Sequence, residues 1–362
     1  MVKSCYIHIP FCKNICSYCD FCKMFYHKEM VREYLNALEK EINQFYQKEE
    51  LETIYIGGGT PSALESDELK RLFSILGKLK RKENAEVTIE GNFESTTKEK
   101  LELYQSFGVN RLSFGIETTS SKHLRYLNRE LSKEQVEEVI HSARKMGFQN
   151  INVDLIYALK EETIQILEKD IDFILSLGVD HISTYSLMIE PHTILKINKE
   201  VPISEELDEE MYQLICKKLK ESGYNHYEIS NFCLEGKQSK HNMTYWHNEE
   251  YYGFGLGASS YLNNNRETTT RSYTNYVKGK YHKEVEVLSK EDKMFYEVIC
   301  HMRLKEGIYL PSFKEKYGMN LQDIFPFQDL IQENLLVESE NSLQIPEEKW
   351  YISNEILVRW LG

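Results

Sequence analysis

Four cysteines close to the start of the chain could together bind a metal. They are Cys12, Cys16, Cys19 and Cys22. Thiolates at such short spacings hold either a structural zinc ion or an iron–sulfur cluster. Zinc would need further ligands to close a tetrahedron; His8 and His27 flank the cysteines, but no second cysteine pair follows downstream. An iron–sulfur cluster on three thiolates would leave one iron open to a small molecule.

The composition predicts a soluble, cytoplasmic protein. The 362 residues suggest one large domain and a smaller appendage, with 41% hydrophobic and 28% charged residues. No apolar run approaches the roughly 20 residues of a transmembrane helix, and the start MVKSCYIHIP is too short for a signal peptide. A net charge of −13 argues against a nucleic-acid partner, while a peripheral membrane contact stays open. Four scattered cysteines are interpreted as buried thiols: Cys5, Cys216, Cys233 and Cys300.

Short β-rich runs alternate with amphipathic helical runs over the first half of the chain. The predicted strands cover residues 5–9, 53–59, 85–91, 110–117, 150–157 and 181–190. The predicted helices cover residues 31–46, 69–81, 97–108, 132–147 and 162–178. Six successive β-α units predict an α/β fold, a partial (β/α)6 TIM-like barrel with parallel strands and right-handed crossovers. The active groups of such a barrel lie at the carboxyl ends of its strands.

Each predicted strand delivers a distinctive group at that end. The first strand leads into the cysteines, and the second ends in a run of three glycines at 57–59, which lets the backbone approach a ligand closely. The next three strands carry Glu90, Glu117 and Asp154. Buried acids need compensating charge, and Arg129 could supply it.

The cysteine spacing after a short strand resembles the signature of radical S-adenosylmethionine (SAM) proteins. The wording YIHIPFC…CSYCDF is similar to that of oxygen-independent coproporphyrinogen III oxidases and their relatives. This resemblance implies a radical SAM barrel in which Cys12, Cys16 and Cys19 hold a [4Fe-4S] cluster whose open iron chelates SAM. Decarboxylating members carry a further cysteine where this chain has Phe21. Cys22, one residue later, is therefore expected not to be a ligand.

The same resemblance implies a set of SAM-binding residues. They are Tyr6, Tyr18, Gly57, Gly58, Gly59, Thr60, Glu90, Glu117, Arg129 and Asp154. Several places depart from the family pattern: Phe93 replaces a proline, Glu117 replaces a glutamine, and Ala158 and Lys160 lie in a loop that reads YALKEET instead of YGLPGQT. A carboxylate only accepts hydrogen bonds, whereas glutamine also donates them. The departures predict either loop drift or a degenerate site.

A segment dense in aromatic residues follows the sixth strand, and it contains the sequence HNMTYW at 241–246. One interpretation is a buried sheet edge with half-exposed aromatic rings. The other is a haem site, because imidazole is a common axial ligand of haem iron and aromatic rings can flank a macrocycle. His241 is then the candidate ligand, with His247 next. The candidates for the propionates are Lys237, Lys240 and Arg266.

The pattern H-N-x-x-Y-W resembles the haem chaperone branch of the family. It implies a protein that binds haem, a [4Fe-4S] cluster and SAM, and that delivers haem to client proteins, with an electron donor for the cluster as a further partner. The alternative is an oxygen-independent coproporphyrinogen III dehydrogenase of porphyrin biosynthesis, in which a SAM-derived radical drives oxidative decarboxylation. Phe21 in place of the extra cysteine, and a start only eleven residues before Cys12, favour the chaperone. Radical chemistry on another substrate is a third hypothesis.

The predicted domain division has three parts. Residues 1–225 form the radical SAM barrel, residues 226–285 form an aromatic-rich connecting segment, and residues 286–362 form a smaller, mainly helical, winged-helix-like domain. In this last part, residues 335–348 predict a small hairpin around Glu340 and Asn341. His301 and Trp350 are interpreted as packing residues.

Overall fold

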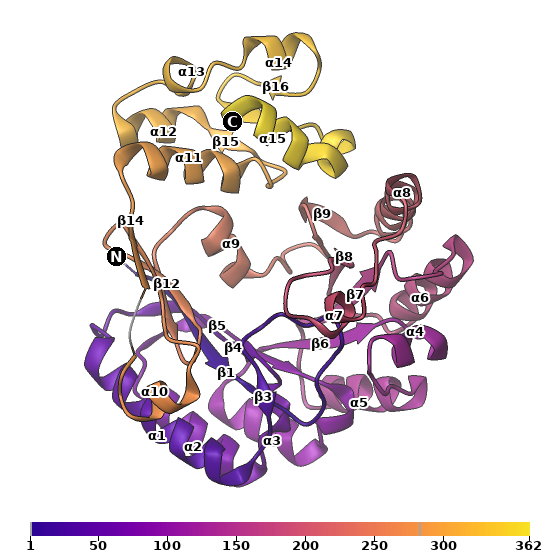
Figure 1. Cartoon of the computed structure of the whole chain (residues 1–362), viewed down its shortest axis with the longest axis vertical. Coiled ribbons are helices and arrows are strands. Elements are labelled where there is room, and N and C mark those ends of the chain that lie inside the picture. Colours follow the sequence, from indigo (N-terminus) through magenta and orange to yellow (C-terminus); the bar gives the residue numbers. More distant parts are fainter. Residues whose placement is uncertain (1, 282–283) are drawn as a thin grey trace.

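The centre of the molecule is a curved sheet whose six middle strands are parallel and follow one another in chain order (Figure 1). The computed structural model describes residues 2–281 and 284–362. The six strands are β1 (Ser4–Ile9), β4 (Leu51–Gly58), β5 (Arg81–Gly91), β6 (Arg111–Glu117), β7 (Ile151–Tyr157) and β8 (His181–Ser186). This order confirms the predicted partial (β/α)6 barrel.

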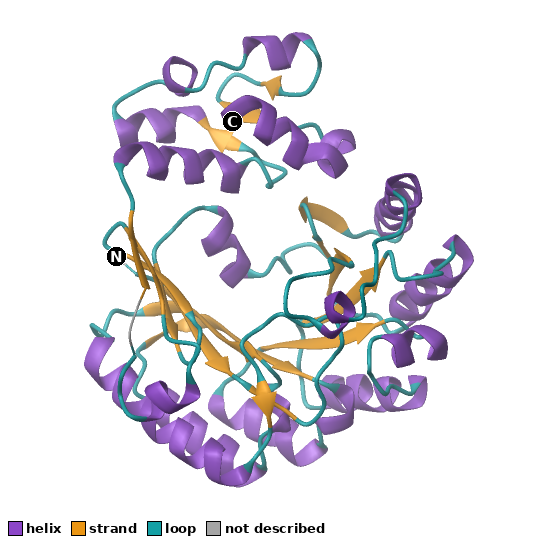
Figure 2. Ribbon diagram, in the orientation of Figure 1, coloured by secondary structure: helices purple, strands orange, loops and turns teal. Residues whose placement is uncertain are grey.

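Helices cover the convex face of this sheet (Figure 2). They are α1 (Lys28–Phe45), α2 (Ser66–Leu76), α3 (Lys98–Phe107), α4 (Ser121–Tyr126), α5 (Lys133–Lys145) and α6 (Ile164–Ser176). Each longer helix is amphipathic, and its apolar stripe packs on the sheet; in α1 the buried stripe includes Leu35, Leu38 and Ile42. Gly108 ends α3 with a φ of +91°, a conformation that glycine adopts without strain.

The helix predicted over 69–81 is too long at its carboxyl end. It stops at Leu76, and the chain then enters β5 at Arg81 rather than at residue 85. The predicted sixth strand also ends early, at Ser186 instead of 190. Both differences lie at element ends, where local pattern is least informative and pairing with a neighbouring strand decides.

The aromatic-rich segment adds strands to both edges of the sheet. On the far side of β8 lie β10 (Asn231–Cys233) and β9 (Asn225–Glu228), both in antiparallel pairing. On the far side of β1 lies β11 (Tyr251–Phe254), which pairs in parallel with β1. The antiparallel strands β12 (Ser259–Leu262), β13 (Asn265–Thr268) and β14 (Glu284–Val287) extend that edge. Helix α9 (Lys240–Trp246) lies on the concave side of the sheet (Figure 1).

The C-terminal part is a small module of helices around a three-stranded sheet. Its main elements are α11 (Lys290–His301), α12 (Leu310–Tyr317), α15 (Ser353–Leu361), β15 (Ile308–Tyr309), β16 (Val337–Glu338) and β17 (Ser342–Gln344). The predicted hairpin is present as β16 and β17. The long helix α8 (Glu205–Glu221) follows the barrel strands. The short elements are β2 (Phe11–Cys12), β3 (Met24–Phe25), α7 (Ile194–Ile197), α10 (Tyr273–Val277), α13 (Leu321–Ile324), α14 (Gln328–Gln332), and the 3-10 turns at Pro61–Ala63, Phe93–Ser95 and Glu347–Ile352. In the described residues, no helix is both long and apolar enough to cross a membrane.

Trp350 connects this module to the sheet, as its predicted packing role requires. It is 1% exposed, its indole nitrogen donates to the Ile345 carbonyl at 3.0 Å, and its ring meets His226 of β9 edge-on at 4.5 Å.

We expect Trp350→Ala to lower the free energy of unfolding by about 3–5 kcal/mol, because a large buried ring leaves a cavity. Urea unfolding followed by circular dichroism measures the change. Val358→Ala, at a side chain that is 72% exposed, is the control and should stay within about 0.5 kcal/mol of the parent. Equal stability of Trp350→Ala and the control would contradict a packing role.

Candidate functional site

A cavity of about 360 Å³ opens at the carboxyl ends of the parallel strands. Its lining brings together the cysteine loop after β1, the glycine loop after β4 and the inward-facing side chains of β5 to β8. Of the residues predicted as ligands, those that line it are Cys12, Cys16, Tyr18, Cys19, Gly58, Gly59, Thr60, Glu90, Glu117, Arg129 and Asp154. Residues from six separate stretches therefore meet at one place, as the barrel geometry predicts.

The cysteine loop is held by the loop that follows α4. The Ser17 amide donates to the Leu127 carbonyl at 3.0 Å, and the Ser17 hydroxyl donates to the Tyr126 carbonyl at 2.6 Å. Two thiols also have polar neighbours: Thr60 Oγ1 donates to Cys12 Sγ at 3.6 Å, and Arg129 Nη1 donates to Cys16 Sγ at 3.8 Å. Donors at sulfur favour thiolates, which are the form that binds metal.

Burial opposes ionisation of these thiols. It raises the pKa of Cys12 to about 11 and raises the pKa values of Cys16 and Cys19 as well. The Arg129 charge partly offsets the shift at Cys16, and the Lys23 charge does so at Cys19. A bound cation would favour the thiolate form of these cysteines.

The donor set fits a cluster better than a single ion. In the part of the chain that the structure describes, no group of three or more His, Cys, Asp or Glu side chains is arranged to hold one metal ion. Zinc would require its ligands to converge on one point. The thiolates of an iron–sulfur cluster bind separate irons, so three cysteines that line one cavity without converging are compatible with a cluster.

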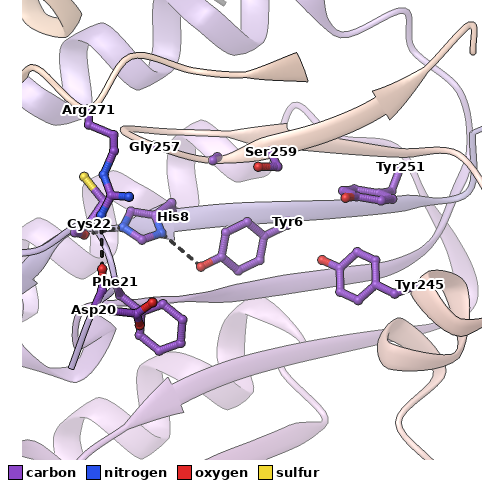
Figure 3. A pocket seen from close by; sticks show the side chains of 11 residues that line it. Tyr6, His8, Asp20, Phe21, Cys22, Tyr245, Tyr251, Gly257, Ser259 and Arg271 are labelled. Carbon is purple, nitrogen blue, oxygen red and sulfur yellow. Dashed lines mark hydrogen bonds between the residues drawn. The ribbon is translucent and has the colours of Figure 1, made fainter. Parts of the chain in front are cut away.

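Cys22 lies in a different pocket, shown in Figure 3. There its thiol is next to the Arg271 guanidinium, and its backbone carbonyl accepts a hydrogen bond from His8 Nε2 at 2.6 Å. Because a carbonyl only accepts, Nε2 carries the proton, and Nδ1 accepts from the Tyr6 hydroxyl at 3.0 Å. Cys22 and Tyr6 thus face this second pocket and not the cavity of the other three cysteines.

The glycine loop gives Glu90 its position. Glu90 accepts from the Tyr55 hydroxyl at 2.7 Å and from the Gly58 amide at 2.9 Å. A Cβ at Gly57 would come within 2.7 Å of the Glu90 carboxyl carbon, so a larger residue there would displace that carboxyl group. Gly57 does not line the cavity itself; it makes room for the acid that does.

Glu117 forms a buried ion pair at the end of β6. Its carboxylate is 3.1 Å from Arg129 Nη1 and accepts from the Tyr18 hydroxyl at 3.0 Å. Burial raises the pKa of Glu117, and the Arg129 charge opposes that shift. Glu117 also has a φ of +63°, at a register shift between β6 and β7. A left-handed non-glycine residue in a strand stores strain of the kind found at binding sites.

Arg111 is a residue of the cavity that sequence reasoning missed. It is 2% exposed, it lines the cavity, and its buried Nε has no hydrogen-bond partner among the described residues. Its charge lowers the pKa values of Glu90 and Asp154, which burial raises. Strand alternation could have predicted this position of Arg111, because every second residue of β6 faces the same side, and residues 111, 113, 115 and 117 all line the cavity.

Most departures from the family pattern lie outside the cavity. Phe93 is buried against Phe114 with 4.8 Å between ring centroids. Lys160 forms an exposed ion pair with Glu200 at 2.9 Å, and Ala158 is buried with a φ of +63°. Glu117 is the one departure of those four that lines the cavity.

His241 is placed differently from the predicted haem ligand. It is 1% exposed, its Nδ1 is 2.7 Å from Thr53 Oγ1 and its Nε2 is 2.8 Å from the Tyr245 hydroxyl. Its ring stacks on Tyr55 at 5.1 Å, and burial lowers its pKa to about 3. Both nitrogens are occupied, so the structure does not present His241 to an iron atom. Asn242, the next residue, does line the cavity.

Comparison with known proteins agrees with this arrangement. The sequence model of the Radical SAM superfamily matches residues 6–174, and that of the HemN C-terminal domain matches residues 288–352. The solved structure of coproporphyrinogen III oxidase (HemN) from Escherichia coli superposes with a TM-score of 0.88 and 21% identity, covering 99% of this chain and 90% of that chain. That likeness shows the fold.

Curated relatives extend over the whole chain. "Heme chaperone HemW" of Bacillus subtilis is 36% identical over all of both chains. The protein of the same name from Lactococcus lactis is 35% identical over 99% of this chain and 97% of the other. That of Escherichia coli is 29% identical over 99% and 98%.

The fold and the cysteine cavity thus define a protein of the radical SAM class. Within that class, the chain belongs to the HemW family.

The raised pKa of Glu90 makes stability depend on pH. Burial raises that pKa to about 7, well above the value of about 4.3 in an unfolded chain. Between these two values the folded state holds more protons than the unfolded state. The stability that protonated Glu90 contributes is therefore fully present below the lower value and is lost as pH rises through about 7. We expect cluster-free protein to lose up to about 3 kcal/mol between about pH 5 and about pH 7.5, and Glu90→Gln to flatten that slope.

Urea unfolding at a series of pH values measures the slope. Glu102→Gln, on the exposed face of α3, is the matched control and should leave it unchanged. An identical slope in Glu90→Gln and the parent would show that Glu90 does not titrate in this range.

Proposed function

We propose that this protein is a haem chaperone, which binds haem and delivers it to client proteins. The observation that carries the proposal is identity of 35–36% to proteins named heme chaperone HemW over at least 97% of both chains, together with the cysteine cavity common to the class. Haem-accepting clients and an electron donor are the partners that the proposal includes.

The cavity residues divide into two groups under this proposal. Cys12, Cys16 and Cys19 hold a [4Fe-4S] cluster, which when bound supplies an open iron for the amino and carboxylate groups of SAM and an electron that can cleave it. The backbone of Gly58 and Gly59, which lines the same cavity, would hold the methionyl end of SAM. Glu90, Glu117 and Asp154 would accept hydrogen bonds from SAM, and the Arg129 charge favours the ionised form of Glu117 against the effect of burial.

Coproporphyrinogen III decarboxylation is the second candidate function. The likeness in fold to the Escherichia coli enzyme favours it, but at 21% identity that likeness supports the fold alone. Phe21 occupies the place of the extra cysteine, and Cys22 faces the second pocket. We therefore rank it below the chaperone.

The ligand assignment predicts different outcomes for neighbouring cysteines. Cys12→Ser should abolish the visible absorption of the reconstituted cluster, while Cys22→Ser should keep the full iron content, because its thiol lies in the other pocket. Iron and sulfide analysis after anaerobic reconstitution is the measurement. An equal loss of iron in both variants would show Cys22 to be a ligand.

Haem binding itself is tested by titrating anaerobically reconstituted protein with haem and following the Soret band. We expect saturable binding close to one haem per chain. Conversion of coproporphyrinogen III by the reduced protein with SAM, and no haem binding, would instead establish the second candidate function.

A further inference from the structure

The mouth of the cysteine cavity carries exposed apolar side chains that the cluster and SAM do not use. Phe21 is 63% exposed, Met188 is 68% exposed and Tyr185 is 44% exposed, and all three line the cavity. Scattered exposed apolar residues are ordinary, but a group around one opening marks a binding site for an apolar ligand. We call these three residues the apolar rim.

The apolar rim is formed by two stretches of the chain that line the same cavity. Phe21 belongs to the cysteine loop, whereas Tyr185 and Met188 belong to β8 and the segment after it. That segment continues into α7, whose Leu195 amide donates to the Ser17 carbonyl of the cysteine loop at 3.1 Å. Beyond it, Ile197 and Val201 are 71% and 73% exposed.

The chemistry of the rim fits a haem. Met188 offers a thioether sulfur, which is a known axial ligand of haem iron. Phe21 and Tyr185 offer flat rings for a macrocycle. The polar interior of the cavity suits SAM, so a macrocycle would lie across the opening. Both ring nitrogens of His241 are hydrogen-bonded inside the wall, whereas the Met188 side chain is exposed at the opening.

The charges around the rim set the orientation of the two propionates. On the Phe21 side lie Lys23, which donates to the Cys19 and Phe21 carbonyls, and Arg271, which donates to the Asp20 carbonyl at 3.0 Å. Neither cation pairs with a carboxylate in the part of the chain that the structure describes. Asp20 is the single acid among the pocket-lining residues of that loop, and Glu190 lines the cavity on the Met188 side.

We propose that haem binds across the mouth of the cysteine cavity, with Met188 Sδ as an iron ligand, its macrocycle against Phe21 and Tyr185, and its propionates toward Lys23 and Arg271. This site rests on the proposed haem chaperone function and gives it a location.

The test is a haem titration of cluster-loaded protein, followed by the Soret band and by the far-red band that methionine-ligated ferric haem shows. Met188→Ala should raise the Kd for haem about tenfold or more and abolish the far-red band. Met188→His should restore the affinity with a changed Soret position, because imidazole replaces the thioether. Met319→Ala, at an exposed methionine of the C-terminal module, is the matched control and should behave as the parent.

Iron-free protoporphyrin IX separates ligation from ring contact. Its Kd should be unchanged in Met188→Ala and raised in Phe21→Ser, whose iron content is checked to confirm that the cluster is retained. Haem binding by the parent with unchanged affinity and spectrum in both variants overturns the site but leaves the chaperone function standing. No haem binding by the parent overturns both.

Discussion

The buried ion pair between Glu117 and Arg129 is the interaction on which the site depends. The two side chains come from the end of β6 and from the loop after α4, and Tyr18 of the cysteine loop bonds to the same carboxylate. Breaking a buried pair typically costs about 3–5 kcal/mol, because the remaining charge has no partner. One contact thus fixes three segments that must agree if the three thiols are to share a cavity. Arg129 also reaches Cys16 Sγ, so the pair acts directly on a thiol as well as on its loop.

The polar cavity of the barrel combines three acids with two guanidinium groups. The acids are Glu90, Glu117 and Asp154, and the guanidinium groups are those of Arg111 and Arg129. Burial raises the pKa of each acid, which favours its uncharged form. The Arg111 charge opposes that shift at Glu90 and Asp154, and so limits the repulsion between these two acids.

Sequence reasoning predicted the six parallel strands because each is followed by a helix with a clear apolar stripe and the whole unit repeats. It also placed the strand-end residues in one cavity, since parallel strands end on the same side. The pairing of β11 with β1 was not predictable, because it joins residues about 250 apart and has no local signal. Strand ends such as Ser186 likewise depend on partners elsewhere in the sheet.

His241 shows a different limit of sequence reasoning. The sequence around a histidine in a polar, aromatic motif does not show whether its ring faces a ligand or is hydrogen-bonded inside the cavity wall. Only the positions of Thr53 and Tyr245, which bond to its two ring nitrogens, distinguish these cases. The position of Tyr6 in the second pocket could not be predicted either, because strand alternation does not say which of two adjoining pockets a side chain enters. The exposure of Phe21 and Met188 could not be predicted from the sequence, because it depends on how the loops fold around the opening of the cavity.

The loop after β7 has a consequence for how this chain could change over evolutionary time. Ala158 and Glu161 both adopt left-handed backbone conformations, with φ values of +63° and +57°, at a cost of about 1–2 kcal/mol for each side chain. Glycine carries no such penalty there, and one nucleotide change converts an alanine codon or a glutamate codon to a glycine codon. Since neither residue lines the cavity, replacing either one by glycine would stabilise the fold without changing the site. During evolution, such a glycine substitution could offset a destabilising change elsewhere in the chain without altering the ligands of the site.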